Sequence, residues 1–345
     1  MSDPSDVGML QCYGKEHMLP PGYIALYDSG ELQRRSQALE KRLSSCDICP
    51  RRCHVNRLEG ERGVCRSGSL AAVSAVCDHY GEEPPISGTK GSGAIFFAGC
   101  NLRCVFCQNH QISQPLLLTQ HDEEDAATLA QHMLHLQDNL GCHNINLVSP
   151  SHFVPQIAQA LVEAVPLGLH IPLVYNSNAY DSLATLRALE GIVDVYLPDL
   201  KYASDFYAKR FSRAQHYVNY SQVAIVEMYR QVGNLVVDEN GLARSGLIVR
   251  HLILPHRIAS SRKSLFWLTR SISPEVTVSI MSQYHPCHKA LAVPLLCRRI
   301  TAAEYLEVTD LLANLCMENG WVQDMDSPET YLPDFDREDH PFAPV

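Results

Sequence analysis

Three closely spaced cysteines are the residues of this chain best suited to redox chemistry. Cys100, Cys104 and Cys107 are separated by three and then two residues, and they directly follow the apolar run 94–98. Thiolates at this spacing can hold three corners of a cubane iron–sulfur cluster, which leaves the fourth iron without a protein ligand. Because an open iron can bind a substrate or a cofactor, the pattern predicts a reaction centre rather than a structural metal site.

A second group of four cysteines lies upstream. Cys46, Cys49, Cys53 and Cys65 are separated by two, three and eleven residues, and His54 is a spare ligand beside them. Four thiols this close together suit either a closed tetrahedral zinc site or a second iron–sulfur cluster. The spacing therefore predicts a second metal, whose identity it leaves open.

The three-cysteine loop needs a rigid support, and the pattern that follows it supplies one. Six apolar runs have the length of buried strands: 94–98, 145–148, 172–175, 192–197, 247–254 and 277–281. They alternate with stretches of helical periodicity at 125–136, 154–165, 182–189, 221–231, 265–271 and 302–316. Strands that are apolar throughout and alternate with helices predict an α/β fold, here a partial (β/α)6 barrel with a parallel sheet. Active-site residues of such barrels gather at the carboxyl ends of the strands, where the three cysteines lie.

The rest of the chain divides around this barrel. Residues 1–45 are predicted to form a peripheral extension with one helix over 31–43, and residues 46–90 a small Cys-rich metal-binding segment and a connection. The barrel is expected over 91–325. The acidic, proline-rich stretch 326–345 is expected to be an extended tail.

Composition favours a soluble cytoplasmic protein. The chain has 28 Lys and Arg against 38 Asp and Glu among 345 residues, a formal charge of −10. An acidic surface argues against nucleic acid or an anionic membrane as a partner, and no apolar run reaches the roughly 20 residues of a membrane span. Clustering of the 13 cysteines, without a secretory signal, favours metal ligation over disulfides.

The cysteine loop resembles the signature of the radical S-adenosylmethionine (radical SAM) superfamily, Cys-x3-Cys-x-aromatic-Cys after the first strand. Cys100, Cys104, Phe106 and Cys107 match it. The resemblance implies a [4Fe–4S] cluster that binds S-adenosylmethionine (SAM) at its open iron, with Phe106 beside the cofactor. It also implies reductive cleavage of SAM to a 5′-deoxyadenosyl radical that abstracts a hydrogen atom. A zinc knuckle or a redox Cys-x2-Cys pair is the alternative, but zinc normally takes four protein ligands.

Within that superfamily the chain is similar to the pyruvate formate-lyase activating enzymes and to relatives with upstream cysteines. The similarity covers most of 46–281 and includes the segments 82–88, 175–176, 198–202 and 249–252. It implies an activating enzyme whose substrate is a protein or peptide, such as the glycine Cα–H of a glycyl radical enzyme.

The same resemblance gives cofactor-binding roles to residues at strand ends. Asp199 and Lys201 match the family's Asp-Leu-Lys, whose lysine pairs with the SAM carboxylate. Arg250 is similar to an arginine near that carboxylate or the substrate backbone, and His285 to a histidine near the ribose or adenine. Each position also has a structural reading, as a solvated lysine, an ion-paired arginine or a hydrogen-bonded histidine.

One departure from the family concerns the methionyl amine. Members commonly carry Gly-Gly-Glu after the second strand, where this chain has the sequence Val-Ser-Pro-Ser-His at 148–152. The hydroxyls of Ser149 or Ser151 and backbone carbonyls can accept hydrogen bonds from the amine, although no carboxylate is present there. Asn176, at the tip of the third strand, is the neighbouring polar residue expected to help, or else a turn-forming asparagine.

Other functions remain open on the sequence alone. A radical SAM enzyme acting on a small molecule is the alternative within the class, while an iron–sulfur electron carrier and a zinc-stapled binding module come from different classes. The carrier is disfavoured because it needs neither an open iron nor six βα units. Radical chemistry implies a reduced flavodoxin or ferredoxin as electron donor.

Overall fold

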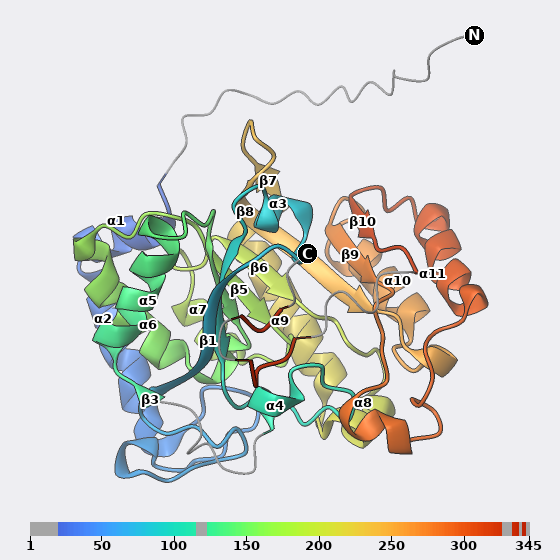
Figure 1. Cartoon of the computed structure of the whole chain (residues 1–345), viewed down its shortest axis with the longest axis horizontal. Helices are drawn as coiled ribbons and strands as arrows, with labels where there is room; N and C mark the ends of the chain where they lie inside the picture. The colour runs from blue at the N-terminus through green and yellow to red at the C-terminus, as the bar shows by residue number, and fades with distance from the viewer. Residues whose placement is uncertain (1–19, 115–122, 326–332, 338–339, 343–345) are drawn as a thin grey trace.

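One sheet organises the chain in the computed structural model, which describes residues 20–114, 123–325, 333–337 and 340–342. Its strands follow the order β10-β9-β8-β6-β5-β4-β2-β1-β3, with β7 paired to β8 off this path. The strands are β1 (Ala71–His79), β2 (Ser92–Phe97), β3 (Glu123–Glu124), β4 (Ile145–Val148), β5 (Leu173–Ser177), β6 (Val195–Pro198), β7 (Val236–Val237), β8 (Ala243–Leu252), β9 (Thr277–Met281) and β10 (Gly320–Val322). Figure 1 shows them crossing the centre of the molecule.

The six predicted strands are present as β2, β4, β5, β6, β8 and β9, and neighbours along this series pair in parallel. Ile95 lies opposite Leu147, which lies opposite Tyr175 on its other side. β10 adds one more parallel strand beside β9. Among the described residues the two ends of the sheet do not pair with each other, so the α/β fold with a mostly parallel, unclosed sheet is confirmed.

Three strands, β1, β3 and β10, were not predicted. β1 lies in the stretch expected to be a metal-binding segment and connection, yet it pairs antiparallel to β2, with Val76 opposite Ile95. Four of its nine residues are buried and five are half-buried, a weaker signal than the continuous apolar runs. β10 has three residues and depends on Gly320, where a side chain would collide with the carbonyl oxygen of Val278.

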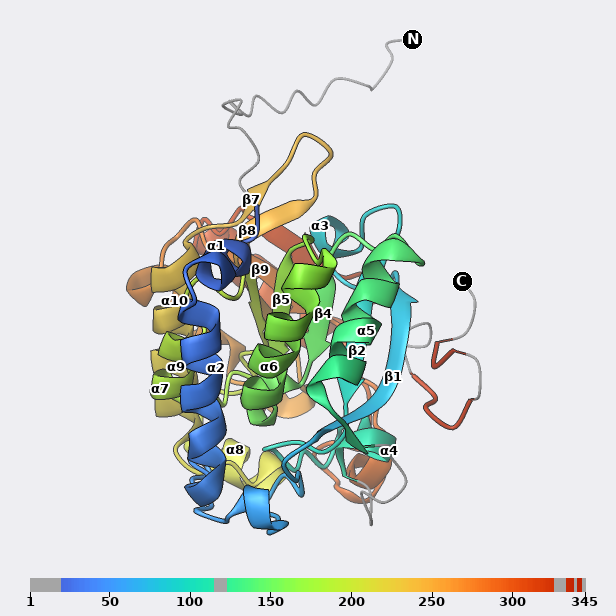
Figure 2. The ribbon, with the colours of Figure 1, turned by 90° about the vertical axis from the view of Figure 1, so that its left-hand side faces the viewer.

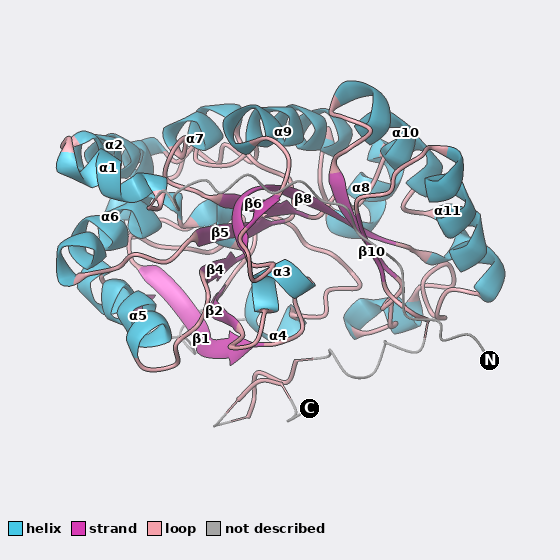
Figure 3. Cartoon of the chain, turned by 90° about the horizontal axis from the view of Figure 1, so that it is seen from above, coloured by secondary structure: helices cyan, strands magenta, loops and turns pink. Residues whose placement is uncertain are grey.

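Most of the helices line the outer side of the curved sheet, whereas the short helix over 84–87 lies on its inner side, as the view from above shows (Figure 3). They are α1 (Gly22–Asp28), α2 (Glu31–Lys41), α3 (Pro84–Ser87), α4 (His110–Ser113), α5 (Ala126–Asp138), α6 (Val154–Ala164), α7 (Leu183–Ala188), α8 (Asp205–Ser212), α9 (Tyr217–Val232), α10 (Ser261–Ser271) and α11 (Ala302–Asn314). The six predicted helices correspond to α5, α6, α7, α9, α10 and α11, while α1, α3, α4 and α8 were not predicted. No helix of the described part is long and apolar enough to cross a membrane.

The N-terminal helices belong to the main layer and are not the peripheral extension that the sequence suggested. α2 packs against α6, in front of the sheet in Figure 2. Leu32 and Leu39 on its inner face are almost completely buried in the main core. Their spacing of seven residues places both on one face of the helix, so the apolar stripe docks α2 onto the barrel.

The described parts of the C-terminal stretch contain no helix or strand. Phe335 and Phe342 pack against Phe96 of β2, with ring centroids 5.3 and 5.9 Å from it. His340 Nε2 lies 3.0 Å from the carbonyl oxygen of Asp78. The other residues of the predicted tail, 326–332, 338–339 and 343–345, lie outside the described residues.

Candidate active site: three cysteines beside a buried ion-pair network

The loop between β2 and α4 places the three cysteines at the carboxyl end of β2. Cys100, Cys104 and Cys107 all line one cavity of about 430 Å³. The loop begins at Gly99, whose φ is +76° and whose hypothetical side chain would collide with the carbonyl oxygen of Cys65. Only glycine fits both the backbone angle and the close approach, so this residue directs the loop across the strand end.

Each of the three sulfurs lies within hydrogen-bonding distance of a polar group. The contacts are Leu102 N and Asn178 Nδ2 with Cys100 Sγ (3.3 and 3.5 Å), Ser212 Oγ with Cys104 Sγ (3.0 Å) and Ser113 Oγ with Cys107 Sγ (3.1 Å). Hydrogen bonds to ligand sulfurs stabilise thiolates and tune the potential of a cluster that they hold. The donor set therefore fits an anionic iron–sulfur cluster.

Burial disfavours the thiolate form of these three cysteines when no metal is bound. It raises the pKa of Cys100 to about 11 and that of Cys107 to about 12, and the charge of Cys104 adds to both shifts. The ammonium of Lys201 opposes these shifts at all three thiols. Because the thiolate is the metal ligand, cluster binding has to displace the protons.

The cysteines present separate sulfurs rather than one tetrahedral site. In the described part of the chain, no three Cys, His, Asp or Glu side chains are grouped so as to hold one metal ion. In a cubane cluster each cysteine binds its own iron, so convergence of three sulfurs on one point is not required.

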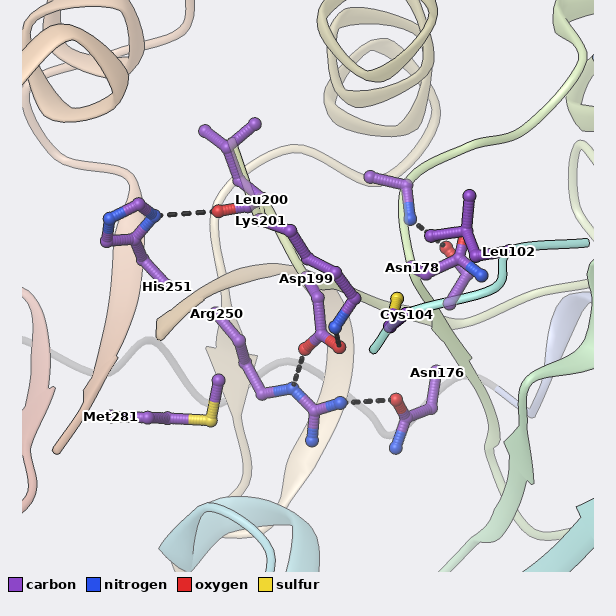
Figure 4. Close-up of polar contacts among 12 residues, drawn as sticks. Leu102, Cys104, Asn176, Asn178, Asp199, Leu200, Lys201, Arg250, His251 and Met281 are labelled. Carbon is purple, nitrogen blue, oxygen red and sulfur yellow. Dashed lines mark hydrogen bonds and ion pairs between the residues drawn. The ribbon is translucent and has the colours of Figure 1, made fainter. Parts of the chain in front are cut away.

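A network of charges and amides lines the same cavity (Figure 4). Asp199 Oδ2 lies 2.7 Å from Lys201 Nζ, and its Oδ1 lies 2.7 Å from Arg250 Nε. Arg250 also donates to Glu82 Oε2 (2.9 Å) and Asn176 Oδ1 (2.5 Å). The ends of β5, β6 and β8 thus place Asn176, Asp199, Lys201 and Arg250 together at one wall of the cavity.

The charged forms of Asp199 and Lys201 stabilise each other. Burial alone would raise the pKa of Asp199, but the positive charges of Arg250 and Lys201 outweigh it and hold the pKa below its usual value. Burial likewise works against the charged form of Lys201, yet Asp199 and Cys104 keep its pKa above the ordinary value. Buried charges of this kind persist because each has a partner of opposite sign.

Glu82 is the site residue that the sequence analysis missed. Its carboxylate accepts hydrogen bonds from Arg250, from Asn146 Nδ2 (3.0 Å) and from Asn176 Nδ2 (3.3 Å). It lies before the barrel, in the motif at 82–88. The motif was a signal for the family, but nothing in the local sequence pairs Glu82 with an arginine 168 positions away.

Phe106 and His285 line the cavity as well. The ring of Phe106 is buried, in edge contact with Tyr284 and Tyr202 at centroid distances of 5.9 and 6.4 Å. His285 is only half-buried, and its Nδ1 lies 3.3 Å from Arg299 Nη2.

The two serines that were predicted to bind the cofactor lie in different surroundings. Ser149 lines the cavity, with a backbone in the left-handed region (φ +61°) and its N–H donating to the carbonyl of Asn176. Ser151 is buried and does not line the cavity; its hydroxyl faces Asp181 and Tyr175. Of the pair, Ser149 is the one placed to meet a ligand.

The upstream cysteines gather in a second, smaller pocket. Cys46, Cys49, Cys53 and Cys65 all line it, together with Arg57. Burial raises the pKa of Cys49, and the charges of the other three thiols raise it further, which places the four sulfurs near one another.

Comparison with known proteins agrees with this geometry. Residues 94–238 match the family model of the radical SAM superfamily. The uncharacterized protein MJ0674 of Methanocaldococcus jannaschii is 31% identical over 274 residues, covering 77% of this chain and 74% of that protein. A second protein of that organism, MJ0808, is 29% identical over 48% of this chain and 51% of its own length.

A solved structure, that of methylornithine synthase, aligns with 92% of this chain and 85% of its own at 12% identity and a TM-score of 0.42. The chain belongs to the radical SAM superfamily. That membership implies a [4Fe–4S] cluster and SAM as cofactors, and it supports radical SAM chemistry as the class of reaction.

Proposed function

We propose that the protein is a radical SAM enzyme that modifies a protein or peptide, with the Cα–H of a glycine as the reacting group. When bound, the cluster supplies an electron that cleaves SAM to methionine and a 5′-deoxyadenosyl radical. Cys100, Cys104 and Cys107 are the residues that would hold it.

The remaining cavity residues bind and orient the cofactor in this proposal. Lys201 and Arg250 meet the SAM carboxylate, and Asp199 holds both cations in position. Ser149 and Asn176 accept hydrogen bonds from the methionyl amine in place of the missing Gly-Gly-Glu. Phe106 and His285 lie on the side of the adenosine.

The shape of the cavity supports a substrate that enters from the side. Its lining includes Phe96 on β2 and Trp321 on β10, which belong to the two ends of the parallel series. The cavity therefore borders the side on which the sheet stays unclosed. A backbone segment of a partner protein can reach a cavity of this kind, whereas a folded domain cannot enter it.

A small-molecule substrate is the second possibility, favoured by the cavity volume of about 430 Å³. Sites of roughly 300–1,000 Å³ are typical of small ligands. The two substrates are distinguished by whether turnover requires a macromolecule in an anaerobic extract.

The test of radical function is anaerobic reconstitution with iron and sulfide, reduction with dithionite, and addition of SAM. We expect 5′-deoxyadenosine, which chromatography measures, and its loss in Cys104→Ala. Cys142→Ala, at a buried cysteine outside both groups, should retain it. Absence of cleavage in a fully loaded protein under any reductant would contradict the proposal and favour an electron carrier or a zinc-stapled module.

We also propose that the upstream cysteines bind a second metal and that the electron donor is a reduced flavodoxin or ferredoxin. Both fit a cytoplasmic protein, where thiols stay reduced. The acidic charge of the chain argues against nucleic acid or membrane as a partner. Replacing dithionite by reduced flavodoxin should sustain SAM cleavage.

A further inference from the structure

The pocket of Cys46, Cys49, Cys53 and Cys65 contains a buried positive charge with an unused hydrogen-bond donor. Arg57 is 1% exposed, and it lines this pocket with the four thiols. Its Nε donates to the carbonyl of Gly68 (2.8 Å) and its Nη1 to that of His152 (2.7 Å). Its Nη2 is buried without a hydrogen-bond partner among the described residues, and the guanidinium carbon lies over the ring of Phe153, 5.7 Å from its centroid.

An orphaned guanidinium nitrogen beside four thiols indicates what the pocket is built to hold. A buried cation is costly unless an anion faces it. Four thiolates around a metal centre carry net negative charge, and both ligand and cluster sulfurs accept N–H hydrogen bonds. Arg57 thus supplies a counter-charge and a donor for a centre that these cysteines ligate.

The segment around these cysteines is already joined to the barrel without a metal. Cys46 and Ile48 belong to the main hydrophobic core. Thr185 Oγ1 donates to the carbonyl of Ile48 (2.6 Å), and Arg51 Nε donates to that of Asn101 (2.7 Å). These contacts hold the segment on the barrel in the absence of a bound metal.

The second pocket directly adjoins the radical loop. The carbonyl of Cys65 packs against Gly99, the residue before Cys100. Arg103 joins the two groups, because its Nη2 donates to the carbonyl of Val64 and its Nη1 lies 3.4 Å from that of Cys100. Backbone and guanidinium contacts thus connect the two cysteine groups.

We infer that Cys46, Cys49, Cys53 and Cys65 ligate a redox-active iron–sulfur cluster, balanced by Arg57, that passes electrons to the radical loop. One electron from a reduced flavodoxin- or ferredoxin-type donor reduces this cluster, which is oxidised again when the electron moves to the cluster of the three-cysteine loop. The relay step rests on the radical function proposed above, whereas cluster binding does not.

Two full-length variants isolate the two groups. Cys100→Ser/Cys104→Ser/Cys107→Ser leaves the upstream group untouched, and Cys46→Ser/Cys49→Ser leaves the radical loop untouched. After anaerobic reconstitution, each should keep about half of the iron and sulfide of the wild type, and the triple variant should show the Mössbauer signature of a [4Fe–4S] cluster. Cys142→Ser is the matched control and should keep all of it.

Zinc, or no metal, in the triple variant overturns the inference, and zinc content is measured on the same sample by plasma mass spectrometry. If the triple variant keeps its cluster but the wild type cleaves no SAM, the radical function is contradicted and cluster binding by the upstream cysteines is not. The double variant should retain SAM cleavage with dithionite but lose at least tenfold with reduced flavodoxin. An equal loss of SAM cleavage with both reductants would contradict the electron-relay role of the upstream cluster.

Arg57 has its own spectroscopic test as a positioning residue. In the triple-variant background, Arg57→Met should shift the midpoint potential of the upstream cluster to more negative values, because the more anionic reduced state loses its counter-charge. Arg57→Lys should restore most of that shift. An unchanged potential in a folded Arg57→Met protein, checked by circular dichroism, would contradict its role.

Discussion

Lys201 and Asp199 form a half-buried ion pair, 2.7 Å between Nζ and Oδ2, within Coulombic reach of Cys104. The other carboxylate oxygen of Asp199 binds Arg250. One carboxylate therefore holds two cations at the cavity wall, with their N–H groups already arranged for an anionic ligand. Binding of a SAM carboxylate has to compete with Asp199 or add to its contacts.

Asp199→Asn should lower the free energy of unfolding by about 3 kcal/mol, because Lys201 and Arg250 would both lose a buried partner. Urea denaturation at pH 7 measures the change, and the exposed Asp28→Asn is the control. Since the pKa of Asp199 is held below its usual value, its contribution is present above about pH 4 and is lost as the pH falls through the lowered pKa. Equal stability of the two variants would contradict this role.

Gly99→Ala should disrupt the radical loop far more than the same change at Gly241. The two residues have φ angles of +76° and +75°, but nothing lies within 4 Å of a side chain built at Gly241. Backbone strain of about 1–2 kcal/mol applies to both, whereas only Gly99→Ala meets the carbonyl of Cys65. We expect loss of loop-bound iron in Gly99→Ala alone, measured after reconstitution. Similar iron contents would show that the close contact is dispensable.

Ser212→Ala should shift the midpoint potential of the loop cluster to more negative values. Ser212 Oγ donates to Cys104 Sγ at 3.0 Å, and loss of a hydrogen bond to a ligand sulfur destabilises the more anionic reduced state. A redox titration followed by electron paramagnetic resonance measures the shift. Ser182→Ala, which also replaces a buried serine but at the N-terminus of α7, is the control; a shift of equal size there would contradict the assignment.

Asp194 should make stability depend on pH near neutrality. Burial raises the pKa of Asp194 to about 7, although its carboxylate accepts hydrogen bonds from the N–H groups of Leu173 and Gly22. The folded state then binds a proton that the unfolded state releases, so the free energy of unfolding falls by roughly 3–4 kcal/mol from about pH 4 to about pH 7 and is flat above. Asp194→Asn should remove this decline, as urea titrations across the range would show. A decline of the same size in the variant would assign it to another group.

Six strands of the parallel part of the sheet could be predicted because each contains a nearly continuous apolar run. Helix α2 shows where such reasoning fails, because its stripe through Leu32 and Leu39 was visible but its partner α6 lies far away in the sequence. β1 was not predicted because its half-buried residues interrupt the apolar pattern of a buried strand. Patterns local to the chain reveal elements, whereas docking depends on surfaces brought together by folding.

The candidate site shows the same contrast between residues found from local sequence and residues defined by long-range contacts. Cys100, Cys104 and Cys107 could be predicted from spacing, and Lys201 and Arg250 from family resemblance. Glu82 could not, because its role rests on contacts with Arg250, Asn146 and Asn176 across the cavity. Ser151 was misplaced because the fold turns it toward Asp181 rather than the cavity.

The position of Glu82 ahead of the first parallel strand has a consequence for how the molecule can be divided. A fragment that starts at Gly91 would retain every strand of the parallel series but would leave one end of the Arg250 guanidinium without an anion. It would also lack the Cys65 segment against which Gly99 packs. The barrel of this protein is therefore not a separable module: its catalytic end becomes complete only when the preceding residues have folded onto it.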